Sequence, residues 1–327
     1  MVTLVDDETL TRLLVEANPA RTPPDAQPDA EIRRIRAQLM APARVRRRAR
    51  GARLAWGSAL VAAAAAVAFV VGVLVPNGPA VAVTPAPLIF ADAGSAAQIV
   101  DRAATALSER QGPQTPTRTV ETVSWSLAVD VDEQHMAVVP QFSRLTWNED
   151  LSGHLTIIEG KPYWPSDAPA GSVEAVIGDE VLVDSAFEPG QYTTPVVAPP
   201  GDSLEEVTAM LAAFGMPDDP TAGDVMIALY TALDQWTLTD EQQRQLLGYL
   251  VSRDGVEAVG STTDRLGRAV DAIRVVASRG VSDTVLISQQ TGRIVGIETQ
   301  QLEGDGIIPA GAVVSYRLWD LFDERNP

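Results

Sequence analysis

Two histidines and one serine motif are the first residues in this sequence that could carry out chemistry. Gly201-Asp202-Ser203-Leu204 matches the nucleophile motif of some serine hydrolases. Such enzymes need a histidine downstream of the serine to accept its proton, but His135 and His154 both precede Ser203. Glu206 follows Ser203 by three positions, which is the pattern of a helix N-cap. We therefore expect Ser203 to begin a helix and not to act as a nucleophile.

Metal and phosphate sites are not expected either. His135 follows three acidic residues, Asp130, Asp132 and Glu133. Neighbouring positions of a strand point to opposite faces, so these side chains do not converge on one ion. Glu303-Gly304-Asp305-Gly306 lacks the lysine and the spacing of a phosphate-binding loop and is interpreted as a turn. We assign no catalytic residue, cofactor or metal ligand, and we expect a protein that is not an enzyme.

Four aromatic residues form the candidate ligand groove of this sequence. They are Trp147, Tyr163, Trp164 and Tyr192. Aromatic side chains on one face of a sheet could line a hydrophobic groove for an apolar ligand, although such residues more often belong to the core. Both interpretations, groove and core, remain open at the level of the sequence.

Residues 54–75 form an uninterrupted run of uncharged, mostly apolar side chains. A helix of this length is about 33 Å long, enough to cross a hydrocarbon core of about 30 Å. The alternative is a buried helix of a soluble protein, but such helices seldom run this far without a polar face. The sequence therefore predicts a single transmembrane helix.

Charge is divided unevenly around this helix. Residues 1–53 carry a net charge of +4 and residues 54–327 a net charge of −22. Short Arg-rich segments stay in the cytoplasm and contact anionic headgroups, so we expect a cell-membrane protein with its N-terminus inside and its acidic part outside. An acidic exported part also argues against nucleic acid as a partner. The arginines expected to set this topology and contact the lipid bilayer are Arg44, Arg46, Arg47, Arg48, Arg50 and Arg53.

A cleaved signal peptide is the main alternative to a membrane anchor. Ala80-Val81-Ala82 fits the small-x-small pattern of a cleavage site. The apolar run is longer than the usual 7–15 residues (approximate range), and a long segment precedes it, so an uncleaved anchor is favoured. Cysteine is absent from the sequence, so the outer part must be held together by its apolar core.

Residues 1–53 are an Arg-rich cytoplasmic tail with two short expected helices. One interpretation is a topology signal lying on the inner headgroups. The other is a docking tail for a cytoplasmic partner, such as a sigma factor bound by a membrane-anchored anti-sigma protein. The tail is short for a folded anti-sigma domain and lacks histidine and cysteine, so the first interpretation is favoured.

Residues 76–90 are rich in proline and predict an extended stalk. Residues 91–327 predict an outer domain of strands, then helices, then strands, which favours an α+β fold: an antiparallel sheet with helices packed on one face. Capping patterns predict helices beginning at Ser95, at Ser203, at Asp219 or Thr221, and at Thr239. Alternating apolar residues predict strands over 119–132, 137–147, 152–159, 179–184, 256–262, 268–277, 283–289, 293–301 and 312–321. The strand over 119–132 is expected to have one buried face, and turns are predicted at Asp264–Arg268 and at Thr291-Gly292.

Four short motifs stand out near the C-terminus: Gly255–Gly260, Asp264–Val270, Leu286–Ser288 and Thr291–Gly296. These motifs and the layout of tail, membrane helix, stalk and acidic domain resemble an uncharacterised family of actinobacterial single-pass membrane proteins. Ser288-Gln289-Gln290 stands where an Asp-Pro pair often precedes the Thr-Gly turn in that family. The resemblance implies no activity and no catalytic residue.

The expected outer domain is also similar to the lipoprotein-carrier and sigma-regulator fold, in which helices close a curved sheet over an apolar groove. This is an analogy of fold and transfers no function. We expect a membrane-anchored, non-enzymatic binding or sensing protein that takes an apolar ligand or an envelope protein outside and is regulatory through its tail. The alternative is a tethered carrier of envelope lipid or lipoprotein.

Overall fold

The structure is a computed structural model, and it describes residues 84–109, 112–127, 138–163, 177–276, 280–304 and 308–321. The chain divides into two compact units, 1–55 and 56–327, and every described residue belongs to the second. The predicted tail, the predicted membrane helix 54–75 and the six topology arginines lie outside the described residues. Within the described ranges, no helix is long and apolar enough to cross a membrane.

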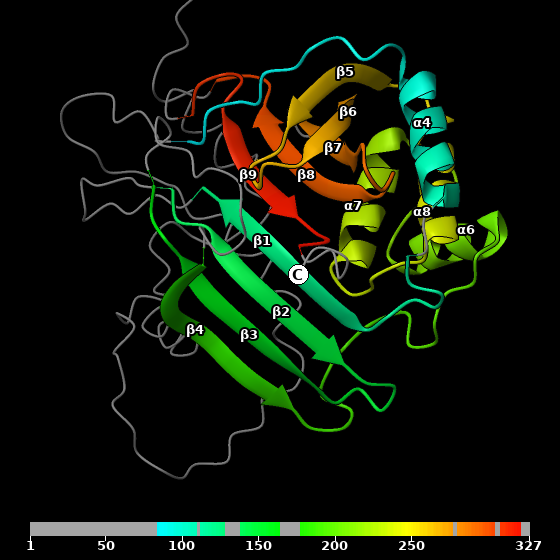
Figure 1. The fold of residues 1–327 in the computed structure, drawn as a ribbon. Helices are drawn as coiled ribbons and strands as arrows, with labels where there is room; N and C mark the ends of the chain where they lie inside the picture. Colours follow the sequence, from blue (N-terminus) through cyan, green and yellow to red (C-terminus); the bar gives the residue numbers. More distant parts are fainter. Residues whose placement is uncertain are drawn as a thin grey trace, which may run out of the picture. The chain divides into compact units, whose positions relative to one another are not determined.

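The described strands form one antiparallel sheet of nine strands in the order β4-β3-β2-β1-β9-β8-β7-β6-β5 (Figure 1). Two meanders, β1 to β4 and β5 to β9, join where β9 pairs with β1. The strands are β1 Thr119–Ser126, β2 Gln141–Trp147, β3 Gly153–Gly160, β4 Ile177–Phe187, β5 Val256–Thr263, β6 Ala269–Val276, β7 Val281–Ser288, β8 Ile294–Gln301 and β9 Val313–Leu318. Each corresponds to a predicted strand, so the α+β prediction with an antiparallel sheet is confirmed.

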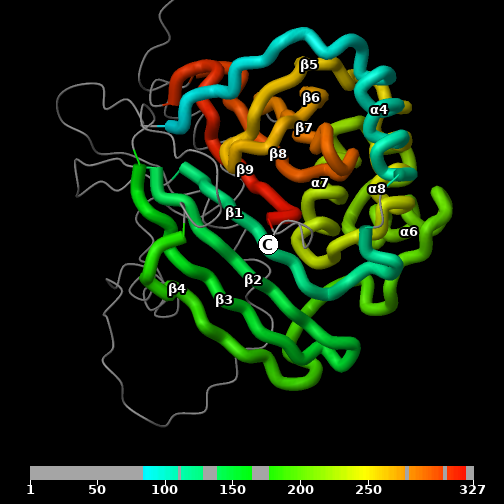
Figure 2. The backbone as a smooth tube through the Cα atoms, in the orientation of Figure 1, coloured from blue at the N-terminus to red at the C-terminus, as the bar shows by residue number. Residues whose placement is uncertain are grey.

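The helices pack beside the β5–β9 half of the sheet, while β2, β3 and β4 extend beyond them (Figure 2). The helices are α4 Ala96–Glu109, α6 Leu204–Ala213, α7 Ala222–Leu233 and α8 Asp240–Val251. Ser203, Thr221 and Thr239 each form a capping box with the residue three positions later. These boxes satisfy N–H groups that have no partner within a helix, which explains why the starts were predictable.

Apolar side chains fill both faces of the central strands. Val120 belongs to the cluster on the helix side, whereas Val123 and Trp125 belong to a second cluster on the opposite face. The prediction that β1 has one buried face is therefore wrong. A half-buried strand alternates apolar and polar residues, but a central strand covered on both faces carries apolar residues at neighbouring positions too.

Two predicted turns are confirmed, and each needs its glycine. Gly267, in the turn that follows Asp264, has φ of +80°, and Gly292, between β7 and β8, has φ of +73°. A Cβ atom added to Gly292 would lie 2.2 Å from the carbonyl oxygen of Ala103 in α4. Glycine thus permits both the backbone conformation and the close approach of the helix.

Candidate functional site

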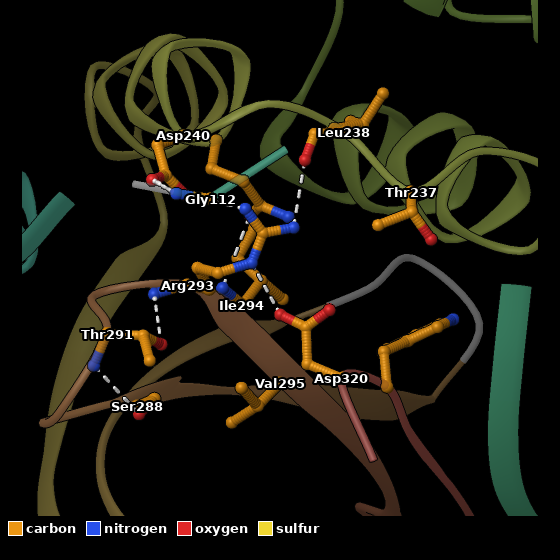
Figure 3. Close-up of polar contacts among 12 residues, drawn as sticks. Gly112, Thr237, Leu238, Asp240, Ser288, Thr291, Arg293, Ile294, Val295 and Asp320 are labelled. Carbon is orange, nitrogen blue, oxygen red and sulfur yellow. Dashed lines mark hydrogen bonds and ion pairs between the residues drawn. The ribbon is translucent and has the colours of Figure 1, made fainter. Parts of the chain in front are cut away.

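Arg293 occupies a buried junction between β8 and the start of α8 (Figure 3). Its Nε donates to Asp320 Oδ2 (2.5 Å), its Nη1 to Asp240 Oδ1 (2.7 Å) and its Nη2 to the carbonyl oxygen of Leu238 (2.9 Å). The side chain is 8% exposed. Burial lowers the pKa of Arg293, but the two carboxylates outweigh burial, and the pKa is raised overall. Arg293 therefore stays charged and paired.

Neighbouring groups extend the junction to more of the fold. Asp240 Oδ2 accepts from the backbone N–H of Gly112 at 2.6 Å, and the N–H of Ile294 donates to Gln243 Oε1 at 3.2 Å. The junction links the segment before β1, the start of α8, strand β8 and the segment after β9. Its charged groups pair with one another, so it holds elements in place and presents no free nucleophile or base.

A second buried ion pair lies on the opposite face of the sheet. Arg265 Nη2 donates to Glu298 Oε2 at 2.6 Å, and the two side chains are 10% and 2% exposed. The guanidinium carbon lies 5.0 Å from the ring centroid of Tyr316, and the Tyr316 hydroxyl lies 3.5 Å from that of Tyr163. Burial raises the pKa of Glu298 more than Arg265 lowers it. Such shifts occur both at functional sites and in structural networks.

Residues 84–91, which we call the docked segment, run along β5 and past this ion pair. Their backbone carbonyls accept from side chains of the outer domain, and Ala91 pairs with β5. The contacts are Arg265 Nη2 to the Ala86 oxygen (3.0 Å), Thr262 Oγ1 to the Ile89 oxygen (2.7 Å), and two backbone hydrogen bonds between Ala91 and Ser261 (2.8 and 2.7 Å). The docked segment therefore covers part of the β5 edge.

Apolar packing and one glycine complete this attachment. Leu88 and Phe90 pack against the cluster on the face opposite the helices, and Pro85 is buried. A Cβ atom added to Gly260, whose φ is +133°, would lie 1.9 Å from the Ala91 oxygen. The last residues of the predicted stalk thus contact the domain, whereas residues 76–83 lie outside the described residues.

Trp147 and Tyr192, two of the four candidate groove residues, lie together on the helix side. Their ring centroids are 5.2 Å apart, and Trp236 meets Trp147 edge-on at 4.9 Å. Trp147 is 1% exposed, and its Nε1 donates to the carbonyl oxygen of Gln235 at 2.8 Å. With no exposed ring face and a satisfied N–H, Trp147 has the environment of a core residue.

Tyr163 lies elsewhere, because it packs against the cluster on the opposite face and approaches Tyr316. Trp164 falls outside the described residues. The structure therefore brings Trp147 and Tyr192 together and separates Tyr163 from them. Pattern reasoning did not assign the aromatic residues to faces, because the loops between the strands decide which side each ring reaches.

Ser203 is the N-cap of α6, as predicted. Its Oγ accepts from the N–H of Glu206 at 3.2 Å and donates to Glu206 Oε2 at 2.6 Å. His154 pairs with Asp184 at 2.8 Å on the exposed part of the sheet, and His135 lies outside the described residues. No cluster of three or more metal-ligating side chains occurs in the part of the chain that the structure describes.

A shallow hollow of about 310 Å³ lies between α6 and the preceding loop. Its lining is mostly apolar and includes Pro195, Val197, Pro200 and Met210. Glu206, on its wall, is already held by Ser203. The hollow could accept one apolar side chain, but it offers no free polar group to orient a ligand.

Sequence reasoning missed the docked segment and the Arg265–Glu298 pair. The proline content of residues 76–90 indicated extended backbone, which the docked segment has, but it did not indicate contact with the domain. The available signal was the apolar run 88–90 next to those prolines, of which Leu88 and Phe90 pack against the domain while Ile89 is 88% exposed. A spacer in water does not need such a run, because an exposed apolar side chain gains nothing there.

Comparisons with known proteins add little to this picture. No protein-family model and no curated protein matches the chain. A comparison of structures gives the dehydratase domain from the CurF module of curacin polyketide synthase, with 11% sequence identity, covering 62% of this chain and 75% of that one. The TM-score of that similarity is 0.13, so it supports no statement about the fold or the activity of this chain.

Proposed function

We propose that this chain is a membrane-anchored, non-enzymatic protein that binds or senses a partner outside the cell through its acidic domain. The predicted helix over residues 54–75 anchors it, and the Arg-rich tail of residues 1–53 stays in the cytoplasm. When the outer domain is occupied, the tail changes its interaction with lipid or with a cytoplasmic partner such as a sigma factor. The layout is similar to that of the single-pass family named above.

The observation that carries this proposal is the attachment of the docked segment. Four hydrogen bonds and the partly buried side chains of Leu88 and Phe90 hold residues 84–91 against the domain. Residues 76–83 then remain as the link to the proposed membrane helix, and at about 3.3–3.6 Å per residue they span at most about 29 Å. A short link to a fixed attachment point suits a sensor, since a carrier needs a tether long enough to reach a second membrane or acceptor.

Protease protection in intact cells tests the topology. A C-terminal tag on the full chain should be cleaved by added protease, whereas an N-terminal tag should be cleaved only after permeabilisation. Replacing Arg44, Arg46, Arg47, Arg48, Arg50 and Arg53 by glutamine should reduce the fraction of correctly oriented chains, because positive charge resists translocation. A protected C-terminal tag, or full-length protein in the soluble fraction, would contradict the proposal.

Two further measurements separate sensing from transport. Affinity capture on residues 1–53 should recover a cytoplasmic protein, and recovery of none would count against the regulatory role. Organic extraction of the purified full chain should yield no stoichiometric lipid. Stoichiometric co-purifying lipid would instead support the tethered carrier.

A further inference from the structure

The outer edge of β4 is open within the described part of the chain. β4 ends the sheet order and pairs on one side with β3, and no described segment pairs with its other side. It is the longest described strand, Ile177–Phe187, and its Val181 and Leu182 are 54% and 43% exposed. A long exposed edge presents unpaired backbone N–H and C=O groups that favour the addition of another strand.

The same edge is acidic. Asp179, Glu180 and Asp184 are exposed, and neither β3 nor β4 contains a lysine or an arginine. Proteins commonly protect an edge strand with lysine, proline or a bulge. Register shifts lie on both sides of Val181, so β4 is irregular around Asp179 and Glu180, whereas Val183–Phe187 pairs with β3 in unbroken register. The edge therefore combines a short regular stretch, in which Asp184 pairs with His154, with the exposed acidic residues Asp179 and Glu180 just before it.

Apolar side chains beside this edge provide a surface for an added strand. The register places Ile157 opposite Val183, and Leu155 points to the same face of β3 as Ile157. All three are half-buried. None belongs to either of the two core clusters formed by the described residues. Alternate side chains of an added strand would lie next to this row.

We propose that the β4 edge binds an extended, positively charged peptide segment of a partner protein by strand addition. The open backbone selects an extended segment, and the acidic residues select a basic one. A second copy of this chain is disfavoured, because pairing β4 with β4 would bring the acidic residues of the two copies together. This inference deepens the proposed function by naming the chemistry of the partner.

The test uses the purified full chain in uncharged detergent, so membrane orientation does not enter. The probe is a fluorescent peptide of about ten residues that alternates valine and lysine, with a valine–glutamine peptide as the uncharged comparison. Fluorescence polarisation measures affinity at low salt, where exposed charges are least screened. Amide hydrogen exchange then shows which strand the peptide protects.

Charge reversal provides matched variants. In Asp179→Lys/Glu180→Lys two adjacent acidic residues of β4 are reversed, and Asp218→Lys/Asp219→Lys reverses two adjacent exposed acidic residues between α6 and α7. We expect the β4 variant to bind the lysine peptide at least roughly tenfold more weakly, and the control to bind within about twofold of wild type.

Protection of β4 amides by the bound peptide, with weaker binding of the glutamine peptide, supports the inference. Equal loss of binding in both variants overturns it, because bulk charge would then explain the affinity. Unprotected β4 amides, or a dimer formed through β4, also overturn it. If the peptide fails these tests while added protease still cleaves the C-terminal tag in intact cells, only the strand-addition inference is overturned. The proposed topology is then unaffected.

Discussion

The two ends of the sheet differ in how their strands are covered. β6, β7 and β8 are buried on both faces, by helices on one side and by a second apolar cluster on the other. β3 and β4 are half-buried or exposed over most of their length. Burial of apolar area is the main favourable term in folding, so the helix-covered end should supply most of the stability.

The two edge strands of the sheet, β5 and β4, also differ in how far they are covered. The docked segment covers part of β5 through Ala91 and Ser261, whereas β4 has no such partner among the described residues. Local stability in proteins varies with the density of buried contacts, and binding surfaces come from the less stable parts. The comparison indicates that the helix-covered end of the sheet maintains the fold, and the β4 end is where we propose that a partner binds.

The largest expected difference comes from removing one arginine at each end. Arg293→Met leaves Asp240 and Asp320 without their shared partner in a buried junction, so we expect a loss of about 3 kcal/mol or more in unfolding free energy. Arg144→Met removes a pair between the exposed Arg144 and the half-buried Glu121 and should cost less than about 1 kcal/mol. Urea unfolding followed by tryptophan fluorescence measures both. Equal losses would show that the Arg293 junction is not structural.

Truncating one isoleucine at each end compares packing directly. Ile273 in β6 is 0% exposed, and Ile157 in β3 is half-buried. Ile273→Ala should cost about 2–5 kcal/mol, since it removes contacts and leaves a cavity. Ile157→Ala should cost about 1 kcal/mol or less, because water can occupy the vacated space. The same urea experiment applies, and a larger cost for Ile157→Ala would reverse the comparison.

The helix-covered end was also the more predictable one. Capping boxes at Ser203, Thr221 and Thr239 and turn glycines at Gly267 and Gly292 are local signals, and each appears in the structure as predicted. The caps and the turn backbones depend on neighbours three or four positions away, so a short window of sequence contains that information. The contact of Gly292 with α4 does not lie within such a window.

The candidate sites depend on long-range pairing and could not be predicted in the same way. Arg265 meets Glu298 and the Ala86 oxygen across large sequence separations, and β9 joins β1 from the far end of the chain. A sequence pattern shows that a strand has an apolar face, but it does not show which strand becomes its neighbour. For the same reason the open edge of β4 was not predicted.

Exposing the β5 edge would make the two edges alike. Gly260→Ala places a Cβ atom against the Ala91 oxygen at a φ of +133°, so we expect the docked segment to leave β5 at a cost of about 1–3 kcal/mol. Gly280→Ala is the matched control, because its φ is +73° but nothing lies within 4 Å of the added atom. Limited proteolysis should cleave near residues 84–91 in the first variant only. An unchanged cleavage pattern would mean that Gly260 does not hold the segment in place.

The smallest expected effect concerns a half-buried acid under the helix layer, Asp283. Burial raises its pKa more than the hydrogen bond from Thr299 lowers it. The folded state therefore holds this proton more tightly than the unfolded state does, and the stability linked to it is lost as pH rises through the raised pKa. Asp283→Asn keeps an oxygen acceptor for Thr299 without the charge. Its melting temperature, relative to wild type, should therefore rise as pH is raised from about 4 to 8.

Glu206 supplies a control of opposite sign. Hydrogen bonds from Ser203 lower its pKa, so its ionised form contributes stability above the unfolded pKa, and that stability is lost as pH falls. Glu206→Gln keeps the capping contacts, and its melting temperature relative to wild type should fall as pH rises over the same range. If both variants shift in the same direction with pH, net charge and not local environment controls the response. In that case the pH dependence of the melting temperature would not report the environment of Asp283, and it would not distinguish the helix-covered end of the sheet from the other end.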